Sequence, residues 1–327
     1  MNKVFISGGS GYIALHTIIL LLRKNYFVVA SVKDKDKIPL VKKCLQENNV
    51  DVSKIEFYVL DLLNDQGWDD ALKGCQYVFH MASPVIPGNV DKDLVVKPAV
   101  EGMARCLNAA IKNKAKKFVL TSSYAAIYGN SKNKFSDNDW TDLNRKDLMP
   151  YEISKTKSEI GMWEVVKNSK YKIEACSINP VLVLGPSVSG VISVSNKQVL
   201  SRILRLPFIP NISVPIVGVK DVANAHLMAM ENKNSNGKRF LITEKTVDLI
   251  HIAKVLKSNN VHVSTLVVSD FIVRLFSFFV PSLRPIVKRL NKKEHLEPKN
   301  AQSILGFRPK SVDLEIANSV QQINSKK

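Results

Sequence analysis

The stretch KVFISGGSGYIALHTIILLLRK, residues 3–24, sets the fold of this chain of 327 residues. Residues 3–7 predict a short buried strand, and an apolar helical run follows a glycine-rich turn. Gly8, Gly11 and Ala14 have the spacing G-x-x-G-x-x-A. In a dinucleotide phosphate site the first residue makes the tight turn, the second lets backbone approach the pyrophosphate, and the third lets the helix pack closely on the sheet. The free N–H groups at the helix N-terminus would bind the anion, so the stretch predicts such a site rather than an ordinary turn.

Apolar segments and helical patterns alternate after this first unit. Further strands are predicted over residues 26–32, 55–62, 75–83, 117–123 and 172–185. The clearest helical periodicity between them covers residues 92–113. This alternation predicts an α/β fold with a doubly wound parallel sheet of the Rossmann type, whose ligand lies at the carboxyl ends of the strands. Polar or small residues occur at four such ends, namely Asp61, Ala82-Ser83, Ser122-Ser123 and Asn179-Pro180.

A tyrosine and a lysine, Tyr151 and Lys155, open the helical segment YEISKTKSEIGMWEVVKN. Side chains at positions i and i+4 lie on one face of a helix. A nearby ammonium lowers the pKa of a phenol, and such a tyrosine can exchange a proton with a substrate oxygen near neutral pH. A second pair with this spacing, Tyr128 and Lys132, crosses the turn-like run 129–131, so its side chains need not meet.

The charged residues after the second predicted strand bear on the choice of cofactor. A site that selects NAD usually has a carboxylate at this strand end, where it binds the ribose 2′-hydroxyl. Lys33 occupies that region here and Lys37 follows it, and ammonium groups suit a 2′-phosphate. The sequence therefore favours NADP(H). Asp34 leaves NAD(H) open, and a solvated charged turn is the alternative interpretation.

Nine segments, in order along nearly the whole chain, resemble the extended short-chain dehydrogenases/reductases of the NAD-dependent epimerase/dehydratase superfamily. Within it the chain is most similar to the group of dihydroflavonol reductases, cinnamoyl-CoA reductases and methylglyoxal reductases. The segments are SGGSGYIA (7–14), LDLLND (60–65), VFHMASP (78–84), KPAVEGM (97–103), VLTSSYAAIYG (119–129), YEISK (151–155), NPVLVLGP (179–186), DVANAHL (221–227) and LGF (305–307). The resemblance implies an NAD(P)-dependent oxidoreductase that acts on CH–OH and C=O groups.

The resemblance also assigns roles to individual residues. Tyr151 would be the general acid, Lys155 would bind the nicotinamide ribose and lower the pKa of Tyr151, and Ser123 would hydrogen-bond the carbonyl, with Ser122 as its rival. Besides Tyr151 and Lys155, the residues implied to bind the cofactor are Gly8, Gly11, Tyr12, Ile13, Lys33, Lys37, Asp61, Leu62, Ala82, Ser83, Pro180, Val181, Leu182 and Val183. Within this set, Asp61 and Leu62 would flank the adenine, and residues 180–183 would lie at the nicotinamide end.

Two positions depart from the pattern of that group. Lys33 stands where arginine is common, and a lysine lacks the bidentate fork of a guanidinium. Val100-Glu101 stand where many related enzymes have an asparagine, in the helix after the fourth strand. The first departure bears on cofactor selectivity and the second on the proton relay.

Length and composition indicate how the chain is organised. With 45% hydrophobic residues it can bury a dinucleotide domain and a smaller second part. We expect the Rossmann domain over residues 1–178, the substrate-binding part over 179–327, and a return of 211–231 to the Rossmann domain. The cysteines lack C-x-x-C spacing, so we expect no disulfide framework and no zinc or other metal site. The first strand starts near Met1, which predicts no signal or transit peptide and a cytoplasmic protein with reduced cysteines.

The formal net charge of +18 comes with 47 basic residues spread along the whole chain. This pattern predicts a solvated basic surface and no specific nucleic-acid site. The most apolar segment, LVVSDFIVRLFSFFVPSL (266–283), is interrupted by Asp270 and Arg274 and is too short to cross a bilayer. Its helical spacing favours a buried helix, and the basic residues that follow make a membrane-surface helix the alternative.

These observations favour an NADPH-dependent carbonyl reductase, reversible and active on a small aldehyde, ketone or alcohol, as a monomer or homodimer. Two alternatives share the scaffold. A nucleotide-sugar epimerase or dehydratase would keep NAD tightly bound and would prefer an acidic residue after the second strand. A non-catalytic dinucleotide-sensing or binding protein would have less need of both Tyr151 and Lys155, and the sequence keeps both.

Overall fold

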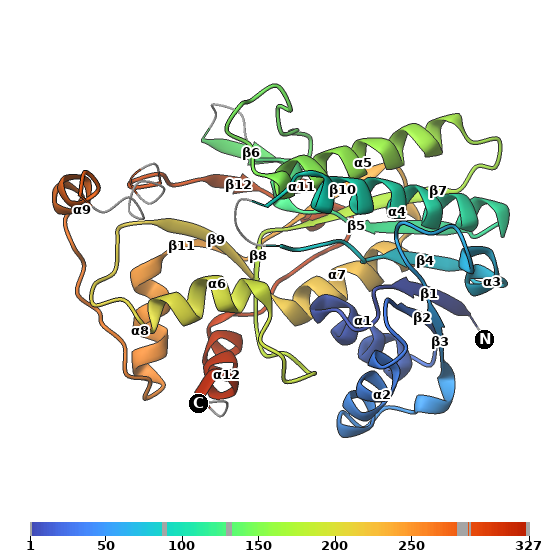
Figure 1. The fold of residues 1–327 in the computed structure, drawn as a ribbon, viewed down its shortest axis with the longest axis horizontal. Coiled ribbons are helices and arrows are strands. Elements are labelled where there is room, and N and C mark those ends of the chain that lie inside the picture. The colour runs from blue at the N-terminus through green and yellow to red at the C-terminus, as the bar shows by residue number, and fades with distance from the viewer. Residues whose placement is uncertain (1, 87–89, 129–132, 280–286, 288, 325–327) are drawn as a thin grey trace.

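A seven-stranded parallel sheet forms the core of the larger part of the molecule (Figure 1). The computed structural model describes residues 2–86, 90–128, 133–279, 287 and 289–324. The order of the strands is β10-β7-β5-β4-β1-β2-β3, and every neighbouring pair is parallel. Their bounds are β1 Lys3–Ser7, β2 Phe27–Val32, β3 Ile55–Val59, β4 Tyr77–His80, β5 Lys117–Thr121, β7 Glu174–Pro180 and β10 Lys238–Ile242. The predicted fold class is confirmed.

Helices cover both faces of this sheet, as a parallel sheet requires (Figure 1). One face carries α1 (Tyr12–Arg23), α2 (Lys37–Glu47) and α7 (Val219–Glu231), and the other carries α3 (Trp68–Leu72), α4 (Asp93–Lys112) and α5 (Pro150–Asn168). Strand β1 illustrates why: Val4 and Ile6 pack in the hydrophobic cluster of α1 and α7, whereas Phe5 packs in the cluster of α3, α4 and α5. Alternate residues of a strand point to opposite faces, so an all-apolar strand needs a cover on each.

A second hydrophobic core surrounds a three-stranded sheet with the order β11-β9-β8. The strands are β8 (Leu182–Leu184), β9 (Ser213–Gly218) and β11 (Lys245–Asp248), and the helices that pack on them are α6 (Val194–Ile203), α8 (Leu249–Ser258) and α12 (Asp313–Asn324). The remaining elements are the parallel pair β6 (Lys134–Ser136) and β12 (His295–Glu297), the short helices α9 (Asp270–Phe276) and α11 (Lys299–Ser303), and 3-10 turns at Val52–Lys54, Tyr124–Ala126 and Lys233–Ser235.

The single strand predicted over residues 172–185 is wrong, because the segment forms two strands in two different sheets. The break falls at Val181, directly after Pro180, which has no N–H to continue a ladder. Val181 instead donates its N–H to the Ile242 carbonyl at 3.1 Å, and the chain then enters the small sheet. An apolar run on its own does not reveal such a change of sheet.

The proposed division at residues 178 and 179 has to be qualified by where later segments lie. Strand β10 comes from the proposed substrate-binding part but extends the large sheet beside β7. Within residues 211–231, α7 packs on α1 beside the large sheet, whereas β9 belongs to the small sheet. The chain therefore crosses from one sheet to the other more than once, and the proposed boundary at residue 179 lies near the first of these crossings.

The buried helix predicted within residues 266–283 is also wrong for the part that the structure describes. Only Val273 of α9 is buried, whereas Ile272, Leu275, Phe276 and Phe279 are all exposed. Helical periodicity predicts that a helix forms, but it cannot show whether a neighbouring element covers its apolar side. Among the described residues, no helix is long and apolar enough to cross a membrane.

Candidate active site

The first two turns of α5 carry the tyrosine and lysine that the sequence pairs. The helix starts at Pro150, whose fixed backbone suits the first helical position, and the Glu152 carboxylate accepts a hydrogen bond from the Met149 N–H at 2.8 Å. Tyr151 and Lys155 are one turn apart, and the Lys155 Nζ lies 5.9 Å from the centre of the Tyr151 ring. The spacing therefore brings these two side chains together.

Ser123 meets this helix from the end of β5. Its Oγ accepts a hydrogen bond from the Ala125 N–H at 3.1 Å, and its side chain also hydrogen-bonds Tyr151. Lys155 donates from Nζ to the Thr121 carbonyl at 3.0 Å, which ties α5 to the same strand end. Serine, tyrosine and lysine thus converge at the carboxyl edge of the large sheet, where a ligand is expected.

The neighbouring Ser122 points away from this site. It is buried, and its Oγ donates to the Glu159 carboxylate at 2.5 Å. Ser123 instead lines the cavity in front of Tyr151. Because successive residues of an extended backbone point to opposite sides, only one of the two serines can face a substrate. The geometry favours Ser123 for this role.

Burial controls the protonation of the pair. It raises the pKa of Tyr151, against the hydrogen bond from Ser123, which lowers it. Burial also lowers the pKa of Lys155 to about 8, although the Glu159 carboxylate acts in the opposite direction. From the sequence we expected Lys155 to lower the pKa of Tyr151. In the structure the desolvation of the phenol outweighs any such effect, so Tyr151 is held in its protonated, proton-donating form.

The site opens into a cavity of about 600 Å³ between the two sheets. Most of its wall is apolar or aromatic, and its charged groups come from Glu152, Arg202, Arg289 and Glu294. Besides these and the residues named above, side chains that line it include Val85, Ile86, Tyr124, Tyr128, Met149, Val194, Gln198, Val199, Ile203, Leu206, Pro210, Ile212 and Leu249. A concave, mainly apolar pocket with a few convergent polar groups is typical of a small-molecule site.

Tyr128, the tyrosine of the second pair, lies at the cavity, which the sequence did not predict. Tyr128 belongs to the wall of the cavity and packs against Tyr124 and Phe135, with ring centres 5.6 Å away in each case. Its partner Lys132 lies outside the described residues. Tyr128 is therefore a contact for whatever fills the cavity, although it has no lysine beside it in the described part of the chain.

The glycine turn after β1 has the geometry that a phosphate site needs. Gly8 has φ +70, and a Cβ there would come within 3.0 Å of the Ala82 backbone. A Cβ at Gly11 would come equally close to the Gly8 carbonyl. Helix α1 then begins at Tyr12, so its first N–H groups, including those of Tyr12 and Ile13, have no partner within the helix. These features fit the pyrophosphate of a dinucleotide.

Other predicted cofactor residues lie along the same edge of the sheet. Asp61 and Leu62 follow β3, and Ala82 and Ser83 follow β4. The buried Ser83 Oγ has no hydrogen-bond partner among the described residues. A buried polar atom without a partner is consistent with a hydrogen bond to a bound ligand. These positions also fit a bound dinucleotide.

The basic residues expected near the 2′-phosphate are at the end of β2. Lys33 directly follows this strand and Lys37 is the first residue of α2, and both side chains are exposed. Asp34 is exposed beside them. Lysines at this position can bind a phosphate without burial, so the geometry is compatible with the predicted role.

The segment from Pro180 to Val183 splits between the cavity and the core. Pro180, Val181 and Leu182 line the cavity. Val183 instead packs among the buried residues around α1 and α7. Of the four residues predicted to meet the nicotinamide, the first three are therefore at the site and the fourth supports it.

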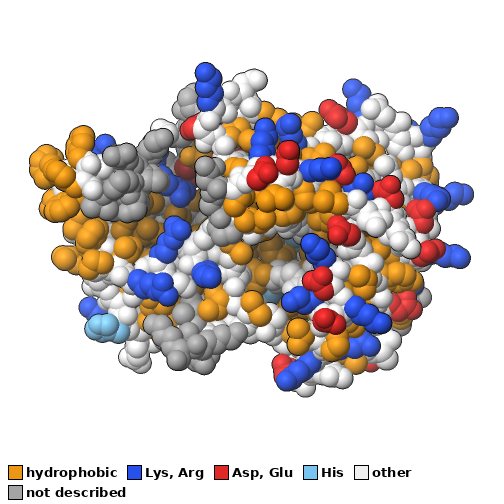
Figure 2. Space-filling view, viewed as in Figure 1, with side chains coloured by type: hydrophobic (Ala, Val, Ile, Leu, Met, Phe, Trp, Pro, Cys, Tyr) orange, Lys and Arg blue, Asp and Glu red, His pale blue; other side chains and the backbone are white. Residues whose placement is uncertain are grey.

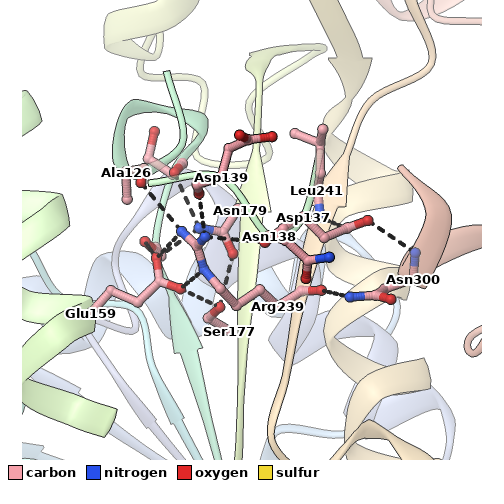
Figure 3. Close-up of polar contacts among 12 residues, drawn as sticks. Ala126, Asp137, Asn138, Asp139, Glu159, Ser177, Asn179, Arg239, Leu241 and Asn300 are labelled. Atoms are coloured by element: carbon pink, nitrogen blue, oxygen red, sulfur yellow. Dashed lines mark hydrogen bonds and ion pairs between the residues drawn. The ribbon is translucent and has the colours of Figure 1, made fainter. Parts of the chain in front are cut away.

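A buried ion pair lies behind Ser123 and Lys155, and the sequence analysis did not predict it (Figure 3). The Arg239 Nε donates to the Glu159 carboxylate at 2.6 Å, and Ser177 and Asn179 donate to the same carboxylate at 2.7 and 2.8 Å. Asn179 also donates to the Ser123 carbonyl at 3.2 Å. Burial would raise the pKa of Glu159, but the charge and hydrogen bond of Arg239 hold it below its ordinary value. The network thus fixes the backbone of Ser123 from behind.

Arg239 also joins α5 and β10 to the loop that precedes the helix. Its guanidinium donates to the backbone carbonyls of Ala126, Asp137 and Asp139 (Figure 3). It also stacks 3.6 Å from the centre of the Trp140 ring. Two signals in the sequence point to this pair. Glu159 continues the four-residue spacing of Tyr151 and Lys155, and Arg239 directly precedes the apolar run Phe240–Ile242.

Comparisons with known proteins agree with this architecture. Residues 4–243 match the model of the NAD dependent epimerase/dehydratase family. A cinnamoyl-CoA reductase (CAD2) of Medicago truncatula is 33% identical over 265 residues, which are 78% of this chain and 80% of the relative. A dihydroflavonol 4-reductase of Arabidopsis thaliana is 30% identical over 267 residues, which cover 78% and 69% of the two chains.

A solved structure shows the same fold over the whole length. The yeast methylglyoxal/isovaleraldehyde reductase Gre2, complexed with NADPH, aligns over 99% of this chain and 98% of its own, with a TM-score of 0.80 and 24% identity. Because the family match spans well over half of the sequence and the Medicago relative is 33% identical, the kinship does not depend on fold alone. This chain belongs to the NAD dependent epimerase/dehydratase family, the extended short-chain dehydrogenases/reductases that its motifs resemble.

Proposed function

We propose that this chain is an NADPH-dependent reductase of aldehydes and ketones. The observation that carries the proposal is the convergence of Ser123, Tyr151 and Lys155 on a mainly apolar cavity at the carboxyl edge of the parallel sheet. The names of the relatives support it, since a cinnamoyl-CoA reductase and a dihydroflavonol 4-reductase are among them. When bound, the dihydronicotinamide would supply a hydride to the carbonyl carbon.

The chain's own residues would manage the oxygen of the carbonyl. Ser123 would hydrogen-bond that oxygen and hold it toward Tyr151. The raised pKa of Tyr151 keeps the phenol protonated at neutral pH, so it can deliver a proton to the developing alkoxide. Lys155, anchored on the Thr121 carbonyl, would place its positive charge beside the phenol as the proton leaves.

Residues around the turn of β1 and the end of β2 would hold the cofactor. Gly8 and Gly11 would admit the pyrophosphate, and Lys33, helped by Lys37, would bind the 2′-phosphate that distinguishes NADPH from NADH. The NADPH in the yeast reductase, a protein of the same fold, is in accord with this choice. The epimerase alternative is less well supported, because a sugar nucleotide would have to bind in a cavity whose described lining is mainly aliphatic and aromatic.

The direct test follows NADPH oxidation over a panel of aromatic and aliphatic aldehydes and ketones. Tyr151→Phe removes the transferable proton and keeps the ring, so kcat should fall by about 10²–10⁴-fold while NADPH still binds. Tyr128→Phe is the matched control, because this residue lines the same cavity and should alter KM without a comparable loss of kcat. A Tyr151→Phe variant that works at the parent rate would refute the assignment.

The cofactor assignment has a separate test. Lys33→Ala should weaken the binding of NADPH by about ten-fold, because a charge-assisted contact to the 2′-phosphate is lost. Binding of NADH, which lacks that phosphate, should change little. Equal losses for the two cofactors, or a parent protein that binds NADH more tightly, would contradict the role of Lys33.

A further inference from the structure

An unusual group of apolar side chains is exposed at the edge of the substrate-binding part. It runs from the segment before α9 to the turn after it, and we call it the α9 patch. Its members are Leu266, Val267, Phe271, Ile272, Leu275, Phe276, Phe278 and Phe279. Phe271, Phe278 and Phe279 are 72%, 76% and 79% exposed. Single exposed apolar residues are ordinary, but a contiguous patch of this kind marks an interaction surface.

The patch is attached firmly to the body of the protein. The Ile209 N–H donates to the Leu266 carbonyl at 2.7 Å, and Ile209 pairs with Val267 as a short parallel bridge. Val273, the single buried residue of α9, packs in the core around the small sheet. The phenylalanines therefore project from an anchored base. Ile209 directly precedes Pro210, which lines the cavity, so the patch adjoins the cavity wall.

The sequence on both sides of the patch is strongly basic, although Lys293 pairs with Asp248 and Arg289 lines the cavity. Between residues 249 and 293 the sequence has eight lysines and arginines and one acidic residue, Asp270. Asp270 accepts a hydrogen bond from the Asn291 side chain, which leaves its charge partly satisfied. Figure 2 shows orange side chains and few red ones at the end of the molecule where α9 lies, whereas red and blue side chains are mixed over the Rossmann domain. A second copy of the chain would bring two such basic regions together, and their like charges would repel.

We propose that the α9 patch docks on the surface of an anionic lipid bilayer. The phenylalanines and leucines would enter the boundary between headgroups and acyl chains, and the neighbouring basic residues would lie against anionic headgroups. Docking needs no membrane-spanning segment. It is independent of the reductase activity proposed above, because none of the patch residues lines the cavity.

Vesicle co-sedimentation tests the proposal. The full chain is mixed with vesicles of phosphatidylcholine and phosphatidylserine, and separately with vesicles of phosphatidylcholine alone. The parent protein should pellet with the anionic vesicles and remain largely in solution with the neutral ones. Added salt should weaken the binding, because headgroup attraction is screened within a Debye length. Absence of binding, or equal binding to both kinds of vesicle, would overturn the proposal.

Two variants identify the surface. The double substitution Phe278→Glu and Phe279→Glu should reduce vesicle binding at least ten-fold. Leu314→Glu is the matched control, since Leu314 is 72% exposed on α12, outside the patch, and should leave binding unchanged. Neutralising Lys292 with Lys292→Gln should cost about five-fold. Equal losses in the control and the double variant would contradict the assignment, as would a parent dimer that the double variant converts to monomer.

Discussion

The ammonium of Lys155 is held between two opposing influences. Burial lowers its pKa to about 8, and the carboxylate of Glu159, one turn further along α5, raises it. Lys155 also lies near the buried His80, whose pKa burial and this ammonium lower to about 3. The charge state of Lys155 at neutral pH therefore depends on Glu159, which is itself ion-paired with Arg239 on β10. We regard Glu159 as a positioning residue for Lys155, the lysine of the proposed catalytic set.

Glu159→Gln tests this role through the pH profile of the reductase. Loss of the carboxylate should lower the pKa of Lys155 further, so kcat/KM should begin to fall at a lower pH than in the parent protein. The sign follows because activity that needs a protonated lysine is lost as the pH rises through its pKa. The measurement is kcat/KM across a pH series at saturating NADPH. An unchanged profile would contradict the coupling.

Stability needs its own control in this experiment, because Glu159→Gln leaves the Arg239 charge buried without its partner. Breaking such a pair typically costs about 3–5 kcal/mol of unfolding free energy. The double variant Glu159→Gln with Arg239→Met removes both charges and should recover part of that loss. It should keep the shifted pH profile, which separates the effect on Lys155 from a general loss of structure.

At the scale of elements, α4 approaches the loop after β3 more closely than an ordinary helix could. A Cβ built at Gly102 would overlap the side chain of Leu62, the residue expected beside the adenine. Gly102→Ala should therefore displace Leu62, weaken NADPH binding and lower the melting temperature. The measurements are a cofactor titration and thermal unfolding, and Leu62→Ala in the same chain should restore part of both losses.

Gly161→Ala provides the control for that substitution. Gly161 lies on α5, which packs against α4, and a Cβ there would meet the flexible end of Met103 at 3.2 Å. An alanine in a helix interior is favoured over glycine by roughly 1 kcal/mol, so this change should be neutral or stabilising. If Gly161→Ala is as harmful as Gly102→Ala, the effect at Gly102 is not specific to Leu62.

The sequence predicts those elements whose local pattern is sufficient to define them. The run from Lys3 to Lys24 predicts its strand, turn and helix because glycine spacing and apolar periodicity are both local properties. The pairing of Glu159 with Arg239 is not local, since 80 residues separate them. They meet because α5 places Glu159 over β7, where Ser177 hydrogen-bonds its carboxylate, and because β10 pairs with β7 at that position. The exposure of α9 also escapes prediction, because the periodicity of a covered and an uncovered apolar helix is the same.

At the scale of the whole molecule, three buried histidines predict how stability depends on pH. Burial lowers the pKa of His16 and His226 to about 4 and that of His80 to about 3. In the unfolded chain all three titrate near 6.5, so between pH 4 and 6.5 the unfolded state binds more protons. Stability should therefore fall as the pH decreases below 6.5, by up to about 1.4 kcal/mol per histidine for each pH unit.

Urea denaturation at a series of pH values measures this dependence. The slope of the unfolding free energy against pH reflects the number of protons taken up on unfolding. His16→Gln should reduce that number by about one, because only His80 and His226 then gain a proton on unfolding. A stability that is flat between pH 4 and 6.5 would show that the three imidazoles are already protonated in the folded protein.

The four cysteines are free and buried, and each belongs to a different part of the Rossmann domain. Cys44 is in α2, Cys75 precedes β4, Cys106 is in α4 and Cys176 is in β7. Burial raises the pKa of every one of these thiols, so none should react with a disulfide reagent while its element stays closed. Each cysteine therefore reports the local unfolding of the element that contains it. The labelling rate at each sulfur, resolved by mass spectrometry, would show the order in which α2, α4, β7 and the segment before β4 open.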